Sequence, residues 1–331
     1  MKTQKNNFLK SIENLLKSTC LEEEIKSVEF FIHNFKILFS EVELLDNNEK
    51  QTGVGVALSS KHAKDCLEDP IRTVRFLKGI YKAIITLDKK FVNEKTTILY
   101  AGCGPLGTLI LPLLGFFSPK KIEVILLDIN TSSIESIKKI VKKLNYEAFI
   151  KEYVIADATK YKKPNDCSLH MIVTETMDKA LTKEPQVEIT RNLSKQLVKK
   201  GIFIPEKIEI KRGYSFFAKE YVFDLKKDIL DLEVEKKESS KEKLFTVTDK
   251  INTKDYFNFE TNWISKPSNF DRKPDICLFT EVIIFEDIKL KKSESFITNP
   301  YCVKSLYTLK KEKYKLQYST KEMPNWRVLE Q

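Results

Sequence analysis

Short apolar segments alternate with amphipathic ones between Thr97 and Val173, and this alternation restricts the possible folds more than any other feature of the chain. Runs with the length and composition of buried strands lie at 98–101, 124–127, 153–156 and 170–173. A stretch with helical spacing, 132–144, lies between the second run and the third. Strands that alternate with helices fold into a parallel, doubly wound sheet. We therefore predict an α/β core in the middle third of the chain.

The segment before this core has a helical pattern. Apolar residues recur at helical spacing within 8–45, and Thr19 and Glu22 have the spacing of a capping box, so two helices are predicted there. The polar stretch 46–52 is expected to form a loop, and a further helix follows Pro70.

After Gly201 the pattern becomes one of short strands. They are predicted at 202–204, 208–210, 245–247, 282–285, 296–297 and 314–318. Their irregular spacing, with Pro and Asn between them, predicts a small antiparallel barrel or sandwich. The charged run 226–243 is expected to form a helical insertion or a loose arm. The chain thus divides into a helical segment (1–60), an α/β domain with its preceding helix (61–205) and a β-rich, barrel-like domain (206–331).

The whole chain has the length and composition of a globular protein. Its 331 residues suffice for two modest domains, because single hydrophobic cores stop growing near ~250 residues. Hydrophobic residues make up 42% and charged residues 31%, which excludes a disordered or fibrous protein. No apolar run approaches the ~20 residues that cross a bilayer, and the start lacks a small-residue cleavage site. We therefore expect a cytoplasmic protein with no membrane partner.

Cysteine spacing and net charge narrow the function classes. The six cysteines include no C-x-x-C pair, which suggests reduced, mostly buried thiols and neither a zinc site nor a disulfide framework. The net charge of +10 is compatible with a polyanionic partner, but lysine and glutamate are mixed along most of the chain. We interpret the charge as a solvated surface and do not expect a nucleic-acid partner.

A glycine loop directly follows the first predicted strand. Glycines let the backbone approach a ligand without a Cβ in the way, and a helix expected to follow within 109–114 would offer unpaired N–H groups. This pattern predicts a cofactor site, which is contacted by Ala101, Gly102, Gly104 and Gly107.

Acidic residues end the next two predicted strands. Asp128 is placed to accept hydrogen bonds from both hydroxyls of a ribose, and Asp157, with its neighbour Ala158, stands where an adenine amino group would be recognised. The glycine loop alone is also compatible with an ordinary tight turn, but the three features together favour a Rossmann-like nucleotide site. The loop departs from G-x-G-x-x-G and has no Walker lysine, which disfavours phosphate-rich cofactors. S-adenosylmethionine (SAM) carries no phosphate.

The segment from about 66 to 205 resembles the protein arginine methyltransferases, a family of class I SAM-dependent methyltransferases. The resemblance rests on 66–73, on the Thr-Glu-Thr-Met sequence of 174–177 with Glu184 beyond it, and on 197–205, which resembles the family's crossing into its β-barrel. It implies SAM as cofactor, with Arg72 gripping the methionine carboxylate. It also implies that Glu175 and Glu184 are the family's paired glutamates and that a homodimer can form through an arm within 221–269.

Two positions depart from the family. Tyr100 stands where many relatives have an acidic or other residue, and the Thr-His-Trp loop is missing, because the corresponding region, 298–303, contains no histidine. Arginine is therefore one possible acceptor among others. His62 matches no family position and is expected to be structural, and Trp263 and Trp326 are expected to serve packing.

Two carboxylates on one loop can grip a guanidinium, orient its nitrogen lone pair and stabilise the cation of the transition state. An amine, imidazole or amide nitrogen can use the same loop. We therefore predict an enzyme that methylates a nitrogen of a protein or peptide. The alternatives are a biosynthetic methyltransferase of a small molecule or ribosomally made peptide, which the missing histidine favours, and a non-catalytic SAM-binding scaffold. Nucleic-acid methylation is disfavoured, because no Pro-Pro-aromatic motif follows the fourth strand and the carboxylates would repel phosphates.

Overall fold

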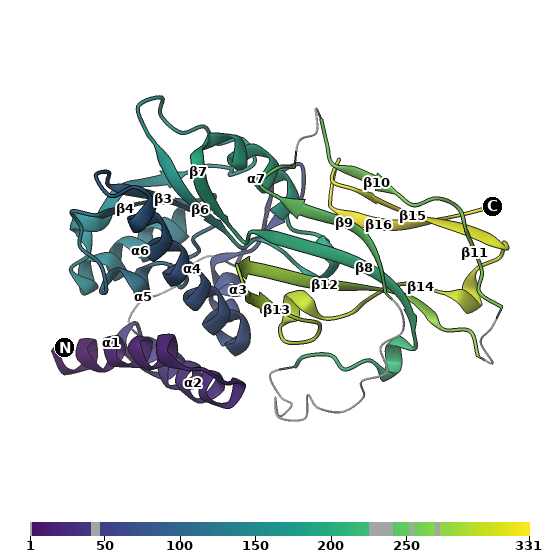
Figure 1. Ribbon diagram of the computed structural model, residues 1–331, viewed down its shortest axis with the longest axis horizontal. Helices are drawn as coiled ribbons and strands as arrows, with labels where there is room; N and C mark the ends of the chain where they lie inside the picture. The colour runs from purple at the N-terminus through teal and green to yellow at the C-terminus, as the bar shows by residue number, and fades with distance from the viewer. Residues whose placement is uncertain (1, 41–46, 225–240, 252–254, 269–271) are drawn as a thin grey trace.

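The parallel sheet predicted for the middle third is present in the computed structural model, which describes residues 2–40, 47–224, 241–251, 255–268 and 272–331 (Figure 1). Five strands in the order β5-β4-β3-β6-β7 pair in parallel throughout. Their bounds are β3 (Thr96–Ala101), β4 (Ile122–Asp128), β5 (Ile150–Ile155), β6 (Leu169–Thr174) and β7 (Leu197–Ile204). The predicted run 202–204 is part of β7, so it extends the parallel sheet and does not begin the β-rich domain. Only the apolar end of this edge strand, Ile202 to Ile204, is buried.

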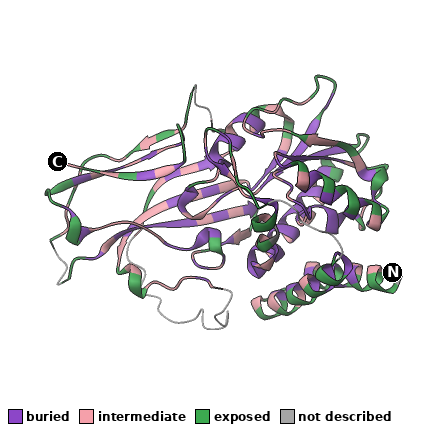
Figure 2. Cartoon of the chain, turned by 180° about the vertical axis from the view of Figure 1, so that it is seen from behind, coloured by how far each residue is buried: buried purple, intermediate pink, exposed green. Residues whose placement is uncertain are grey.

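Helices cover both faces of this sheet, as a doubly wound fold requires (Figures 1 and 2). The side chains of α6 (Thr131–Leu144) and α4 (Pro70–Lys90) join one hydrophobic cluster with alternate strand residues. Ile189 and Leu193 of α7 (Gln186–Leu193) join a second cluster with the others. The helix expected after the glycine loop is short. A series of turns precedes it, and only α5 (Leu111–Leu114) is helical. One of those turns contains Gly107, whose φ of 57° is left-handed.

The N-terminal segment forms the two predicted helices, α1 (Lys2–Lys17) and α2 (Leu21–Leu38), which pack side by side and against α4 (Figure 1). The capping interaction lies one residue from the predicted position. Cys20 is the N-cap of α2, and the Glu23 carboxylate accepts a hydrogen bond of 2.7 Å from the Thr19 amide. A small hairpin of β1 (Lys50–Gln51) and β2 (Val56–Ala57) follows, and then α3 (Ser60–Asp65) and the 3-10 turn η1 (Cys66–Glu68).

The C-terminal part consists of antiparallel sheets, as the sequence predicted. One has the order β13-β12-β8-β9 with β14 on β12, and the other has β10-β15-β11 with β16 on β15. The first contains β8 (Lys207–Ser215), β9 (Glu242–Thr248), β12 (Asp275–Phe285), β13 (Ile288–Leu290) and β14 (Tyr301–Ser305). The second contains β10 (Asn258–Glu260), β11 (Ile264–Ser265), β15 (Lys313–Ser319) and β16 (Asn325–Glu330). In the described ranges no backbone pairing joins the two sheets into a closed barrel.

The remaining short elements are 3-10 turns. They are η2 (Glu147–Phe149), η3 (Lys179–Leu181), η4 (Ser194–Gln196), η5 (Phe217–Lys219), η7 (Phe296–Thr298) and η8 (Leu306–Thr308). The strand predicted at 296–297 is wrong, because these residues form η7. There Ser295 caps the turn through a hydrogen bond from the Ile297 amide.

Two further expectations concern segments with gaps in the description. Of the predicted arm within 221–269, the described strands β9, β10 and β11 belong to the antiparallel sheets, whereas most of the charged run 226–243 lies outside the described residues. A homodimer through this region stays a prediction.

Nowhere in the described ranges is a helix both long and apolar enough to cross a membrane. All six cysteines are free, and Cys20 is the exposed one.

Candidate active site

A pocket lies where the carboxyl ends of β3, β4, β5 and β6 meet at one edge of the parallel sheet, as expected for a ligand site in a doubly wound fold. It holds about 1040 Å³ of empty space, including its open mouth. Of the predicted site residues it brings together Arg72, Gly102, Gly104, Asp128, Asp157, Ala158, Glu175 and Glu184. The other two lie outside its lining: Ala101 is fully buried at the end of β3, and Gly107 packs against Ile137 and Leu111.

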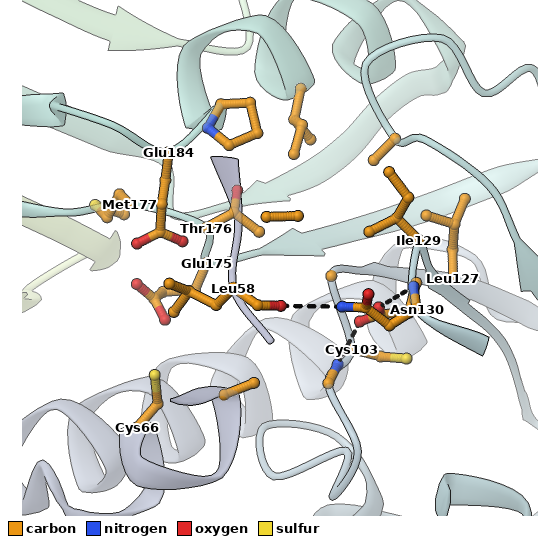
Figure 3. Close-up of a pocket in the computed structure, with 18 of the residues that line it drawn as sticks. Leu58, Cys66, Cys103, Leu127, Ile129, Asn130, Glu175, Thr176, Met177 and Glu184 are labelled. Atoms are coloured by element: carbon orange, nitrogen blue, oxygen red, sulfur yellow. Dashed lines mark hydrogen bonds between the residues drawn. The ribbon is translucent and has the colours of Figure 1, made fainter. Parts of the chain in front are cut away.

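The glycine loop turns the chain sharply at the end of β3. Gly102 has a left-handed φ of 69°, and a Cβ there would lie 2.5 Å from the Thr176 Cγ2 atom. The Gly104 amide donates to Asp128 Oδ2 over 2.9 Å, and the Asn130 amide donates to Oδ1 over 2.8 Å. Burial raises the pKa of Asp128, and the backbone bonds oppose that rise. The loop and Asp128 thus form one wall, on the side of Cys103, Leu127 and Asn130 in Figure 3.

Asp157 also lines the pocket, but its carboxylate is bonded to its own turn. Asp157 Oδ1 accepts hydrogen bonds from the Thr159 amide (2.9 Å) and hydroxyl (2.7 Å). The carbonyl of Ala158 accepts a bond of 2.9 Å from the Asn192 side chain. These contacts fix the turn after β5 at the edge of the pocket.

Arg72 lies in the first turn of α4, where it is 5% exposed. Its Nη2 pairs with the Glu175 carboxylate, and its Nη1 donates to the Cys66 carbonyl over 3.0 Å. Its Nε is buried and has no hydrogen-bond partner in the described part of the chain. Among the described residues, Arg72 at the edge of the pocket therefore has an ionic partner in Glu175 and one buried donor that is not used.

The loop between β6 and α7 carries Glu175 and Glu184. In Figure 3 the two carboxylates lie close to each other, on the side of the pocket opposite Asn130 and Leu127. Burial and the Asp178 carboxylate together raise the pKa of Glu184 to about 8, although the Arg72 guanidinium lowers it. Near neutral pH the Glu184 carboxyl of the free protein is therefore protonated, whereas the Glu175 carboxyl pairs with Arg72.

A side chain ties the two ends of this loop together. Gln186 is fully buried, and its Oε1 accepts hydrogen bonds from the Thr176 amide (2.9 Å) and hydroxyl (3.1 Å). Sequence reasoning missed this clamp, because an isolated glutamine carries no pattern.

The hairpin β1–β2 packs over the pocket, where the sequence predicted only a polar loop. The Val56 amide donates to the Lys183 carbonyl over 2.9 Å, and a Cβ at Gly55 would lie 2.7 Å from that oxygen. On the other side Asn130 Nδ2 donates to the Leu58 carbonyl over 3.0 Å. The segment of the hairpin thus contacts Asn130, beside the wall formed by the glycine loop and Asp128, and also the loop that carries Glu184. Gly53 and Gly55, two residues apart, are the sequence signal that could have indicated a hairpin turn here.

An aromatic side chain borders the pocket near 298–303, the region that corresponds to the Thr-His-Trp loop of the arginine methyltransferases. Phe296, in η7, lines the pocket together with Ile297, and its ring lies 4.9 Å from that of Phe223. No histidine is found among the described lining residues. His170 is buried in β6, where its Nδ1 accepts a bond of 3.1 Å from the Thr97 amide.

One histidine, one tyrosine and the two tryptophans singled out in the sequence differ in burial and in their contacts. His62 lies 3.6 Å from the Glu49 carboxylate. Tyr100 is buried and lines the pocket, and burial raises its pKa. Trp263 is 43% exposed, whereas Trp326 is buried and its Nε1 donates to the Ala180 carbonyl over 2.9 Å.

Comparisons with known proteins give a likeness in structure. No protein-family model and no curated protein sequence matches the chain. Among the solved structures that resemble it is the Trypanosoma brucei PRMT1 enzyme-prozyme heterotetrameric complex with AdoHcy. The similarity covers 77% of this chain and 86% of that chain, with 13% sequence identity and a TM-score of 0.48. This likeness concerns the fold alone, and the chemistry of the pocket follows from its own residues.

Proposed function

We propose that this protein is a SAM-dependent methyltransferase that methylates a nitrogen of a protein or peptide, with arginine as one candidate acceptor. The observation that carries the proposal is the position of Glu175 and Glu184 in the same pocket as the glycine loop and Asp128. Methyl transfer from SAM requires that a nucleophile be held in line with the methyl group and that water be kept away. A pocket with a nucleotide-type wall on one side and two carboxylates on the other suits this task.

The cofactor wall fits SAM by its chemistry. Asp128, held by two backbone amides, would accept hydrogen bonds from the ribose hydroxyls. Arg72, with its unused buried Nε, would bind the methionine carboxylate. Asp157 and Ala158 would contact the adenine. The described lining contains no lysine to bind a phosphate, in keeping with a cofactor that has none. When bound, SAM supplies an electrophilic methyl group on a sulfonium.

The two glutamates would divide the work on the acceptor. Glu175, already ionised beside Arg72, would bind the cationic group and orient it. Glu184 would lose its proton as a guanidinium or ammonium group enters, because a nearby cation lowers a carboxyl pKa. After transfer the Glu184 carboxylate would take the proton that the methylated nitrogen loses.

A second candidate is a biosynthetic methyltransferase that acts on a small molecule or a ribosomally made peptide. The phenyl ring of Phe296 at the pocket, in a lining without histidine, favours this candidate. Its neighbour Phe223 holds the ring in an edge-to-face contact. A non-catalytic SAM-binding scaffold would need the cofactor wall but neither glutamate.

Labelled methyl transfer separates these candidates. The protein is incubated with tritium-labelled SAM and short peptides that each present one arginine, lysine, histidine or glutamine, and products are identified by mass spectrometry. We expect label on one peptide type. Label found only on extracted small molecules supports the second candidate. Tight binding of S-adenosylhomocysteine without any transfer supports the scaffold.

Substitution of the glutamates tests the site itself. Glu175→Gln and Glu184→Gln should each lower turnover by about a hundredfold or more, because the charge that orients the nucleophile is lost. Binding of S-adenosylhomocysteine, measured by calorimetry, should remain within a few-fold. If both variants stay fully active, the site assignment is wrong.

A further inference from the structure

The loop that carries Glu184 has an unfavourable backbone. Ala180, Leu181 and Lys183 have φ values of 54°, 58° and 62°, although none is a glycine. Each residue with a side chain loses roughly 1–2 kcal/mol in this left-handed region. Such a conformation persists only where the surroundings hold it. The contacts that hold it therefore decide where the Glu184 carboxyl lies.

Among the described residues, four polar contacts join these loop residues to the C-terminal part, and each uses a backbone group of the loop. The Ala180 amide donates to Thr280 Oγ1 over 3.1 Å. The Lys183 amide donates to the Pro324 carbonyl over 2.9 Å. In the other two bonds the loop supplies the acceptor. Trp326 Nε1 donates to the Ala180 carbonyl over 2.9 Å, and Tyr318 Oη donates to the Leu181 carbonyl over 2.8 Å.

The two side-chain donors are themselves held rigidly. Tyr318 is fully buried and Trp326 is 7% exposed. Their rings lie 5.0 Å apart, and Phe245 stacks on Trp326 at 5.7 Å with an angle of 15° between the planes. Phe257 and Phe259 also contact Phe245. Since close packing leaves these rings no room to swing, the loop carbonyls receive bonds from fixed points.

We infer that Tyr318 and Trp326 are positioning residues for Glu184, an inference that rests on the proposed function. They bond the loop backbone three and four residues before Glu184, while Gln186 clamps the loop just after it. The C-terminal sheets thus set the acceptor side of the pocket, although they supply none of its carboxylates. The cofactor wall receives no such bond from either residue.

The chain offers a matched control for Tyr318. Tyr314 is also fully buried, on the same strand β15, but its hydroxyl bonds to Arg212 (2.8 Å) and Tyr214 (2.6 Å), within the sheets. Tyr314→Phe and Tyr318→Phe each remove one buried hydroxyl from the same strand. An effect of general stability appears in both variants, whereas a positioning effect appears only in Tyr318→Phe.

The experiment compares Tyr318→Phe, Trp326→Phe and Tyr314→Phe in the full chain. Hydrogen exchange read by mass spectrometry should show faster exchange of the amides of 180–183 in the first two variants only. Calorimetry should give S-adenosylhomocysteine affinities within about twofold of the unaltered protein in all three. With the peptide that is methylated best, kcat should fall about tenfold to a hundredfold in the first two variants, at unchanged KM for SAM, because small displacements of a reacting group are costly.

The positioning role of Tyr318 and Trp326 and the proposed acceptor class can fail separately. The positioning role is overturned if Tyr318→Phe and Trp326→Phe match Tyr314→Phe in exchange and rate, or if all three lose rate and melting temperature alike. If the unaltered protein methylates no peptide, the proposed acceptor class fails. The positioning role is then decided by exchange at 180–183 measured at unchanged S-adenosylhomocysteine affinity, and unchanged exchange overturns it.

Discussion

Glu175 and Glu184 lie on one loop, yet their neighbours differ in charge. Glu175 faces the Arg72 guanidinium, whereas Glu184 is half-buried with the Asp178 and Glu49 carboxylates nearby. Two carboxyl groups whose surroundings differ in this way can separate binding from proton transfer. The raised pKa of Glu184 also affects the stability of the folded protein, because protonation and folding are linked.

The pH dependence of stability should reveal Glu184. Its pKa rises from 4.5 to about 8 on folding, so the stability that its proton provides is fully present below about pH 4.5 and is lost as the pH rises through about 8. Glu184→Gln, which is neutral at every pH, should therefore match the unaltered protein near pH 5. Near pH 9 it should be more stable by up to about 5 kcal/mol, because the pKa differs by about 3.5 units between the folded and unfolded states and each unit corresponds to about 1.4 kcal/mol. Urea denaturation at several pH values measures both.

Glu322→Gln, at an exposed position, serves as the control. Its effect on the free energy of unfolding should be small and should not change between pH 5 and pH 9. A Glu184→Gln difference that does not grow between pH 5 and pH 9 contradicts the assignment of a buried, protonated carboxyl.

At the scale of elements, one carboxylate joins two parts of the pocket that are far apart in sequence. Asp69 caps α4, which presents Arg72, by accepting a bond of 3.3 Å from the Arg72 amide. It also accepts bonds from the Ser295 hydroxyl (2.6 Å) and the Phe296 amide (2.9 Å), at the start of η7. Burial raises the pKa of Asp69, and these bonds oppose that rise.

Loss of this carboxylate should be costly. Asp69→Ala removes a helix cap and leaves buried donors unpaired, so the free energy of unfolding should fall by about 2–3 kcal/mol. Ser295→Ala should lower it by about 1 kcal/mol. Affinity for S-adenosylhomocysteine should fall with Asp69→Ala, because Arg72 loses its support. Asp65→Ala, at an exposed position nearby, should change stability by less than about 0.5 kcal/mol. Equal effects of Asp69→Ala and Asp65→Ala would refute the link.

The elements that sequence predicted correctly are those with a local signal. The strands β3, β4 and β6 are continuous apolar runs, and the polar residues at their ends, such as Asp128 and Glu175, follow from where the runs stop. The missed features depend on distant pairing. The strands of the hairpin β1–β2 are too short for a period, and the contact between Asp69 and Ser295 spans 226 positions. The strand predicted at 296–297 forms η7 instead, because that contact fixes a turn there.

At the scale of the whole molecule, α4 is the element that joins the parts. It packs against α1 and α2, against β7 of the parallel sheet, and against β12 and β13 of an antiparallel sheet. Gly79 marks the closest approach to β12, since a Cβ there would lie 2.5 Å from Ile284 Cγ2. The Glu24 carboxylate of α2 forms ion pairs with Arg75 and Lys78 of α4, each at 2.8 Å.

Gly79→Ala should reverse the usual effect of this substitution. In a helix interior alanine is normally more stable than glycine by about 1 kcal/mol. Here the added methyl group meets Ile284, so we expect a loss of roughly 1–2 kcal/mol in the free energy of unfolding. The double variant Gly79→Ala with Ile284→Ala should be more stable than the sum of the single effects predicts, as a double-mutant cycle in urea would show. Additive effects would mean that the two positions do not contact each other.

The hydrogen bonds between the loop and Tyr318, Pro324 and Trp326 can form only late in synthesis of the chain. These residues are synthesised up to 146 positions after the backbone groups that they bond, which at about 5–20 residues per second is a delay of roughly 7–30 s. The strands that form the cofactor wall leave the ribosome well before that. During synthesis the glycine loop and Asp128 can therefore be assembled while the loop of Glu175 and Glu184 still lacks its support. Under the proposed function, the nascent chain acquires the means to hold a methyl donor before it acquires the means to use one.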